Sequence, residues 1–362
     1  MWGIIISAFC AVAAIGGVYL AVAVSRFGGI KKLARDRKSL SFVISLAIIA
    51  VVFFAAVMIT TSVNAVIILL HFIAFFIFSG LLVKLVEKIR GKEFRHYIQG
   101  WLGIVVSVVY LLIGYYLANN VWQENYSLKT DKNVGTIRIA MIADSHLGAT
   151  FGPEGFAKHL KEIEASGAQM LLIAGDFVDD GTTREDMLRA CQALGEARFE
   201  YGVYLSWGNH DPGYFRGRSF TLKELTDELE KNGVRVLNDE SVLIDGRIYI
   251  VGRRDRSAGS RKSIEELLAG LDTDKYIIVL DHQPNDYDNE AASAADLVLS
   301  GHTHGGQLFP WTTISKLIKV DDRVYGYERR NGTDFIVTSG ISDWEIKFKT
   351  GTKSEYVIID VE

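Results

Sequence analysis

Histidine and acidic residues recur in five short segments of the chain, and each segment directly follows an apolar run. Five of the eight histidines lie in these segments. Imidazole and carboxylate groups together suit zinc, manganese or iron, whereas magnesium alone favours a set of oxygen ligands. The segments are Asp144-Ser145-His146, Gly175-Asp176-Phe177-Val178-Asp179, Gly208-Asn209-His210-Asp211, Asp281-His282 and Gly301-His302-Thr303-His304.

The spacing within these segments indicates a shared metal site. Side chains at positions i and i+2 as a strand ends, such as Asp144 and His146, converge on one ion or flank two. Each segment alone is weak evidence, because an Asp-x-His pair is common and Gly-Asn-His-Asp is also an ordinary turn. Five in order, each after a strand, predict a common metal centre. The glycines ahead of Asp176, Asn209 and His302 permit sharp turns close to it.

The elements that must position these residues have the pattern of an α/β domain. Short runs rich in β-branched and aromatic residues precede the motifs, and segments of helical periodicity separate them. In α/β sheets, ligands bind in the crevice at the carboxyl ends of the strands. The expected strands before the motifs are Thr136–Ala143, Met170–Ala174, Val203–Trp207, Tyr276–Leu280 and Leu297–Leu299; the expected helices are Pro153–Ser166, Arg184–Phe199 and Thr221–Lys231; further strands are expected at Val234–Leu237, Ser241–Ile244, Arg247–Val251, Phe335–Thr338 and Tyr356–Val361.

The amino-terminal third has a different composition. Residues 1–124 hold 11 Lys and Arg against 4 Asp and Glu, whereas the rest of the chain is acidic. Four runs without Asp, Glu, Lys or Arg are each near the roughly 20 residues that cross a bilayer as a helix. Since they leave no polar face for water, buried helices of a soluble domain are disfavoured. The runs are about Gly3–Val24, Phe42–Thr60, Ala65–Val83 and Trp101–Ala118.

These features predict a membrane domain over residues 1–120 with four transmembrane helices, a polar linker over 121–135 and a catalytic domain over 136–362. The loops after the first and third spans carry all eleven basic residues, and the segments before the first span and at Thr61–Asn64 carry none. Basic short loops stay in the cytoplasm. The sequence therefore predicts a multi-pass cell-membrane protein whose catalytic domain lies on the extracytoplasmic face.

Three further features have alternative interpretations. His71, inside the third span, is either a functional ionisable group or a neutral ring hydrogen-bonded within the bundle, and the lack of an acidic residue in any span favours the second. The basic residues of 253–262 either grip an anionic substrate or form a solvated loop. Phe309 and Trp311 either pack in the core, line the pocket or contact the bilayer.

The order DSH, GDFVD, GNHD, H and GHTH resembles the signature of the calcineurin-like metallophosphoesterase family. Gly305-Gly306-Gln307 resembles the membrane-tethered bacterial branch of that family. The resemblance covers about Thr136–Glu362, and it implies an αββα sandwich that holds two divalent metal ions. The segment Gly340–Trp344 departs from the loop that related sequences often carry.

Carried over by position, the resemblance implies two ligand sets that share a bridging Asp176. His210 resembles the family's histidine that binds the phosphoryl group and protonates the leaving oxygen, and Asp211 matches the acidic residue that orients it. The implied ligands of one metal are Asp144, His146, Asp176 and His304, and those of the other are Asp176, Asn209, His282 and His302.

The sequence thus predicts a membrane-anchored, dinuclear metal-dependent phosphoesterase. A metal-bridged hydroxide attacks phosphorus, and His210 is the general acid. The expected cofactors are two divalent ions of manganese, zinc or iron. The expected partner is a phosphomonoester or phosphodiester. Nucleotide, phospholipid head group and phosphoprotein are all open as substrates, although the expected orientation favours a lipid or other envelope ester. No nucleic acid is expected. The alternative is a membrane receptor or scaffold that binds metal and phosphate without turnover.

Overall fold

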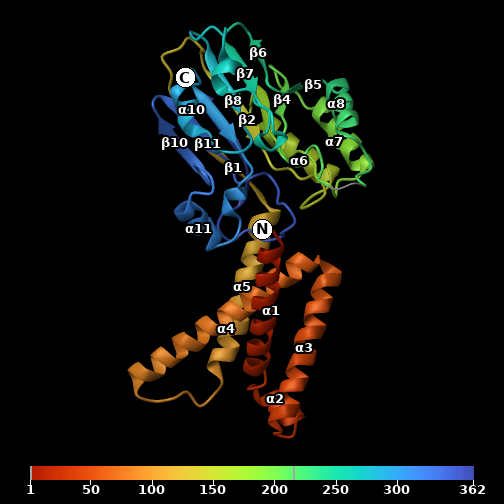
Figure 1. Cartoon of the computed structure of the whole chain (residues 1–362), viewed down its shortest axis with the longest axis vertical. Helices are drawn as coiled ribbons and strands as arrows, with labels where there is room; N and C mark the ends of the chain where they lie inside the picture. Colours follow the sequence, from red (N-terminus) through yellow and green to blue (C-terminus); the bar gives the residue numbers. More distant parts are fainter. Residues whose placement is uncertain (1, 215–216) are drawn as a thin grey trace. The chain divides into compact units, whose positions relative to one another are not determined.

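The computed structural model describes residues 2–214 and 217–362. It divides into two compact units, one ending at Ile113 and one spanning Gly114–Glu362 (Figure 1). Side chains of the first unit are described from Val12 onward. The predicted domain boundary near residue 120 therefore lies a few residues beyond the observed division.

The first unit consists of helices because its sequence is apolar over long stretches and contains no proline. Helix α4 begins with a cap in which the Thr61 hydroxyl accepts from the Asn64 amide, and it ends where Gly91 adopts a left-handed conformation with φ of 64°. The helices are α1 Trp2–Val24, α2 Gly28–Leu33, α3 Lys38–Ile59, α4 Ser62–Arg90 and α5 Ile98–Asn119.

Where side chains are described, three helices are long and apolar enough to cross a membrane, namely α3, α4 and α5. The remaining predicted span, Gly3–Val24, coincides with α1, of which Val12–Val24 is apolar in the described part. Leu20, Ala23, Ile73 and Phe76 pack α1 against α4. These helices support a membrane protein.

His71 lies within α4, and its Nδ1 is 2.8 Å from the carbonyl oxygen of Ile67. The ring also lies 5.5 Å from the ring of Tyr110. These contacts agree with the interpretation of His71 as a ring hydrogen-bonded within the helix bundle.

The second unit contains two six-stranded sheets, in which most neighbouring strands run parallel to each other. The first sheet has the order β1-β12-β2-β3-β4-β5 and the second β10-β11-β9-β8-β7-β6. The strands are β1 Val121–Leu128, β2 Ile137–Ile142, β3 Met170–Ala174, β4 Val203–Ser206, β5 Val234–Leu237, β6 Glu240–Ile244, β7 Ile248–Gly252, β8 Tyr276–Leu280, β9 Leu297–Ser300, β10 Gly326–Arg330, β11 Thr333–Val337 and β12 Ser354–Val361.

Three apolar layers make this unit an αββα sandwich, as predicted. One layer packs the first sheet against α6–α8, a second fills the space between the sheets, and a third packs the second sheet against α9 and α10 (Figure 1). Strand alternation explains this, since Ile139 points between the sheets while Ala140 points to the helices. The helices are α6 Pro153–Ala165, α7 Arg184–Glu196, α8 Leu222–Lys231, α9 Ile264–Leu268, α10 Tyr287–Ala292 and α11 Trp311–Ile318.

Residues 121–128 of the predicted linker differ from expectation, because they form strand β1. This strand pairs in parallel with β12 along its whole length, from Val121 opposite Ser354 to Leu128 opposite Val361. The polar side chains Gln123, Asn125 and Ser127 are exposed, which explains why the segment resembles a linker in sequence. The linker is correspondingly shorter than predicted.

Candidate metal centre

The histidines and acids of the five motifs follow the carboxyl ends of β2, β3, β4, β8 and β9. Five of these residues have backbone φ angles between 34° and 68°, a region that side chains other than glycine seldom adopt. Such strain persists where the surrounding structure enforces it, and it concentrates at functional sites. The five are Asp144, His146, Asp176, His302 and His304.

Glycines let the motif segments approach closely, as predicted. A Cβ atom on Gly208 would lie 2.2 Å from Oδ1 of Asp176. A Cβ atom on Gly175, where φ is 83°, would lie 2.6 Å from Nδ1 of His282. Any larger residue at these two positions would therefore push the motif side chains apart.

Asp144, His146 and His304 form one group that could hold a metal ion, with ligand atoms within 4.8 Å of one another. The rings of His146 and His304 stack with centroids 5.1 Å apart. Both carboxylate oxygens of Asp144 accept from the backbone amide of His302 at 3.0 Å. All three side chains are buried.

Asp176, His282 and His302 form a second such group. Nδ1 of His282 is 2.7 Å from the carbonyl oxygen of Ala174, which leaves Nε2 directed at the carboxylates. The side-chain oxygen of Asn209 lies 3.2 Å from that Nε2. Asn209 is therefore placed beside the second group.

Asp176 belongs to the second group and also faces a histidine of the first group. Its Oδ2 is 3.0 Å from Nε2 of His282 and 3.6 Å from Nε2 of His146. Its Oδ1 accepts from the backbone amide of His210 at 2.8 Å. One carboxylate thus faces histidines of both groups.

Burial and charge divide the histidines into two kinds. Burial lowers the pKa of His282, but the charges of Asp176 and Asp144 outweigh it and hold that pKa well above its usual value. Burial and the charge of His282 lower the pKa of His302 to about 4, and burial holds the pKa of His304 far below its usual value. Burial lowers the pKa of His146 as well, but the neighbouring carboxylates of Asp179, Asp176 and Asp144 raise it above its usual value. Since metal ligands must be deprotonated, binding of cations would displace protons from His282 and His146.

The donor set fits divalent cations. Both ring nitrogens of His146 and Nδ1 of His304 are buried and make no hydrogen bond with good geometry. Unpartnered buried nitrogen is costly, and a metal ion would supply the missing partner. Imidazole, carboxylate and amide donors together suit borderline transition metals.

A family model described as calcineurin-like phosphoesterase matches residues 137–306. An uncharacterized metallophosphoesterase of Aquifex aeolicus is 34% identical over 247 residues, which cover 66% of this chain and 91% of that protein. The chain belongs to the calcineurin-like phosphoesterase family. Membership in this family and the clustered ligands identify a metal-dependent phosphoester hydrolase.

Two other relatives match longer parts of this phosphoesterase. An uncharacterized metallophosphoesterase of Campylobacter jejuni is 28% identical over 295 residues, or 77% of this chain and 75% of that protein. A transmembrane protein with metallophosphoesterase domain from Danio rerio is 27% identical over 307 residues, or 80% and 69%. The names of the relatives leave the substrate open.

The carboxylate beside His210 is not the one expected from the resemblance. Asp211 accepts from the backbone amides of Asp176, Val178 and Gly208 at 2.8–3.1 Å, so it supports the backbone beneath the centre. Burial and the charge of Asp176 raise the pKa of Asp211 to about 7. The acid next to the His210 ring is Asp179, which no ligand set or catalytic role implied by the resemblance includes.

Two exposed aromatic residues that the sequence did not single out flank His210. The ring centroid of Tyr214 lies 4.9 Å and that of Trp344 lies 5.3 Å from the ring of His210. Tyr214 also accepts from the side-chain amide of Asn209 at 2.7 Å. An aromatic residue near a motif carries no sequence signal of its own, so only the fold identifies this pair.

The loop that carries Trp344 is held by a buried ammonium group. Nζ of Lys349 donates to the carbonyl oxygens of Ser339 and Ser342 and lies 3.1 Å from Oδ1 of Asp343. Burial raises the pKa of Asp343, although Lys349 opposes this. The loop contains Gly340–Trp344, the segment expected from the resemblance to differ from related sequences.

The basic loop 253–262 is not a free anion site. Arg253 is buried and pairs with Asp281, Asp286 and Glu290, and Arg261 also pairs with Asp281. These pairs fix the residue that precedes His282. These two arginines therefore match neither of the two interpretations from the sequence, which were binding of an anionic substrate and a solvated loop.

Proposed function

We propose that the phosphoesterase holds two divalent cations, with Asp176 as the shared ligand and Asn209 completing the second set. The position of Asp176 Oδ2 between His146 and His282 carries the proposal. The proposed sets are Asp144, His146, Asp176 and His304 for one ion and Asp176, Asn209, His282 and His302 for the other.

His210 is proposed as the residue that protonates the leaving oxygen. Its Nδ1 faces Asp179, so Nε2 is left for the substrate. The bound cations would supply Lewis-acid activation of water and neutralise charge on the phosphoryl oxygens. Tyr214 and Trp344 then line the side from which the leaving group departs.

The test uses the full chain in detergent. After treatment with a strong chelator, hydrolysis of bis(p-nitrophenyl) phosphate and of p-nitrophenyl phosphate should fall to background. Manganese, zinc or iron should restore it. Activity that survives complete metal removal would refute the proposal, and metal-dependent phosphate binding without hydrolysis would favour the receptor alternative.

A phosphoester in the membrane is the proposed substrate class, and α11 supports it. This helix begins seven residues after His304. A Cβ atom on Gly306 would lie 2.5 Å from Cα of Thr312, so the helix packs on the turn that follows the metal motif. Large apolar side chains on and around it are exposed, namely Phe309, Trp311, Ile314, Leu317, Ile318 and Val320.

Exposed apolar side chains in a contiguous segment mark an interaction surface, and a short amphipathic helix with a tryptophan suits a bilayer interface. Phe309 and Trp311 thus follow the bilayer interpretation rather than core packing. The proposed extracytoplasmic orientation makes an envelope phosphoester, such as a phospholipid, the expected substrate.

This substrate class is tested by comparing two substrates. Replacing Leu317 and Ile318 with serine should lower hydrolysis of phospholipid in vesicles at least about tenfold and leave hydrolysis of the soluble nitrophenyl ester unchanged. Leu243→Ser, which changes an exposed leucine on β6, is the matched control. Equal loss on both substrates would indicate damage to the fold and reject a membrane role for α11.

A further inference from the structure

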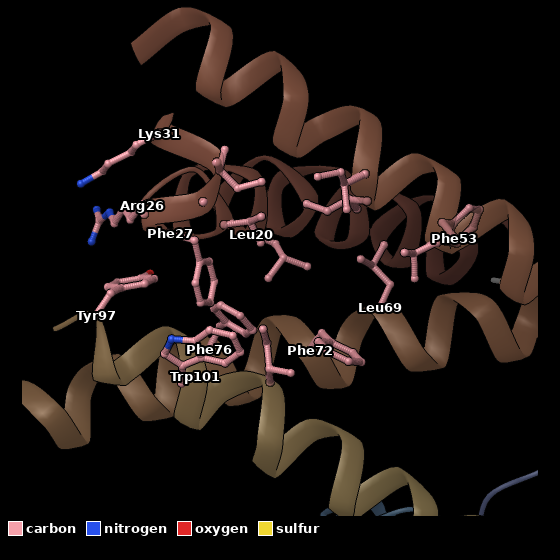
Figure 2. Close-up of a pocket in the computed structure, with 18 of the residues that line it drawn as sticks. Leu20, Arg26, Phe27, Lys31, Phe53, Leu69, Phe72, Phe76, Tyr97 and Trp101 are labelled. Atoms are coloured by element: carbon pink, nitrogen blue, oxygen red, sulfur yellow. The ribbon is translucent and has the colours of Figure 1, made fainter. Parts of the chain in front are cut away.

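The first unit contains a cavity of about 870 Å³ among α1, α3, α4 and α5. This volume lies at the upper end of the range for sites that bind small organic molecules. The cavity is far from uniform along its length. Figure 2 shows Arg26, Lys31 and Tyr97 at one end and Phe53 and Leu69 toward the other.

Most of the wall is hydrocarbon. Val52 and Ile48 are substantially exposed, so the cavity is open to the surroundings of the helices rather than sealed. In a membrane those surroundings are acyl chains. The apolar lining consists of Leu20, Val24, Ile30, Ile48, Ile49, Val52, Phe53, Ala56, Ala65, Ile68, Leu69, Phe72, Phe76 and Ile104.

The other end is basic. Arg26 and Lys31 lie there beside Tyr97 (Figure 2). Arg95 and His96, which precede Tyr97 in the chain, also line the cavity, and the lining contains no aspartate or glutamate. Among the described residues, no ion pair involves these three cations, and Glu87 of the same unit accepts from the backbone amide of Phe94. Three exposed cations converging without a carboxylate favour an anion with more than one negative oxygen.

Aromatic side chains mark the boundary between the two ends. The ring of Phe27 meets the rings of Tyr97 and Trp101 edge to face, with centroids 5.1 and 5.2 Å apart. Tyrosine and tryptophan concentrate at the level of the lipid headgroups. The basic end of the cavity therefore lies at the headgroup level, and the apolar end extends into the hydrocarbon.

We propose that this cavity binds one anionic glycerophospholipid, with its phosphate at Arg26, Lys31 and Arg95 and an acyl chain along the apolar wall. The lining positions on α4 run from Ala65 to Phe76, about 16 Å at 1.5 Å per residue, so the apolar wall covers much of the length of an acyl chain.

The bound lipid is a resident ligand and not the hydrolysed substrate. Neither metal-binding group contributes a residue to the lining. Under the proposed orientation, the basic loops place this headgroup in the cytoplasmic leaflet, away from an extracytoplasmic catalytic domain. The proposal rests on the membrane unit alone, so loss of phosphoesterase function would not affect it.

The test measures lipid retained by the purified full chain. Protein extracted from vesicles of equal phosphatidylglycerol and phosphatidylcholine is analysed for bound lipid by native mass spectrometry. The wild type should retain one phosphatidylglycerol in preference to phosphatidylcholine, and 10 mM inorganic phosphate should not displace it. Equal retention of the two lipids, or displacement by phosphate, would overturn the proposal.

Two variant pairs locate the site. Arg26→Gln, Lys31→Gln and Arg95→Gln together should reduce retained phosphatidylglycerol at least about tenfold, whereas Lys32→Gln, Arg35→Gln and Lys92→Gln, in the same loops but outside the cavity, should not. Val52→Trp should block the apolar end, whereas Val51→Trp faces away from the cavity. Equal losses in target and control variants would refute the assignment.

Discussion

Nδ1 of His210 lies 3.3 Å from Oδ1 of Asp179. The ring is therefore positioned by a residue 31 places earlier in the chain, while the neighbouring Asp211 is occupied with backbone amides. The second oxygen of Asp179 lies 3.2 Å from Nδ1 of His146. Asp179 thus connects the proposed proton donor to the first metal group.

Asp179→Asn should lower kcat about tenfold while metal content stays near that of the wild type, because Asp179 positions a ring and is in neither proposed ligand set. A positioning role predicts that this loss disappears in a His210→Ala background, since the two residues act as a unit. The measurements are steady-state kinetics and metal analysis. Asp186→Asn, in the first turn of α7, is the control, and additive losses in the double variant would contradict the role.

His210→Ala and Asp176→Asn should separate catalysis from metal binding. Loss of a general acid costs roughly 10²- to 10⁴-fold in turnover, and His210→Ala should show such a loss with bound metal nearly intact. Asp176→Asn should lose metal as well, because it faces both groups. Metal content measured by elemental analysis decides the matter, and equal depletion in both variants would make His210 a ligand.

The sequence predicted the two sheets well because buried strands have a simple signal. Met170–Ala174, Val234–Leu237 and Tyr276–Leu280 form strands with the predicted bounds, each being a short apolar run between turns. Gly326–Arg330 escaped prediction since an edge strand with a half-buried glutamate and an exposed arginine resembles a loop in sequence. The strand β1 escaped prediction because its partner is distant in sequence: Val121 pairs with Ser354, 233 places later in the chain.

The metal motifs were accessible to sequence reasoning because residue type and strand end coincide in them. The carboxylate that contacts His210, that of Asp179, could not be predicted from the sequence, because this contact depends on how the loops after β3 and β4 lie against each other. Nothing in the sequence around Asp211 indicates that its carboxylate accepts from the backbone amide of Gly208 instead of facing the His210 ring. Lys349 and Trp344 likewise acquire their places only through the fold.

Asp321 should make the folded chain less stable as pH rises. Burial and the charge of Asp322 raise the pKa of Asp321 to about 6 from 3.8. Between these values the folded state binds more protons than the unfolded state, so stability is lost as pH increases through that window. Asp321→Asn should remove the effect and add about 1 kcal/mol near pH 7, after allowance for solvent screening.

The measurement is the thermal midpoint of the full chain in detergent at pH 7.5 and pH 4. At pH 7.5 Asp321→Asn should raise the midpoint by about 2–4 °C, and at pH 4 the two proteins should coincide. Asp274→Asn, at an exposed site, should change neither value. A gain that persists unchanged at pH 4 would show that the carboxylate's charge is not its cause.

The orientation of the protein should be accessible to protease. The loop after α1 carries Arg26, Lys31, Lys32, Arg35, Arg37 and Lys38, and the end of α4 with the following loop carries Lys84, Lys88, Arg90, Lys92 and Arg95. Residues of both loops line one end of one cavity, so the structure supports their lying on the same side. Basic loops remain cytoplasmic, and an even number of spans then leaves 114–362 outside.

Protease added to intact cells or spheroplasts should therefore remove the catalytic unit, with a cytoplasmic protein as the control for leakage. Cleavage that requires permeabilised membranes would invert the orientation and remove the argument for an envelope substrate.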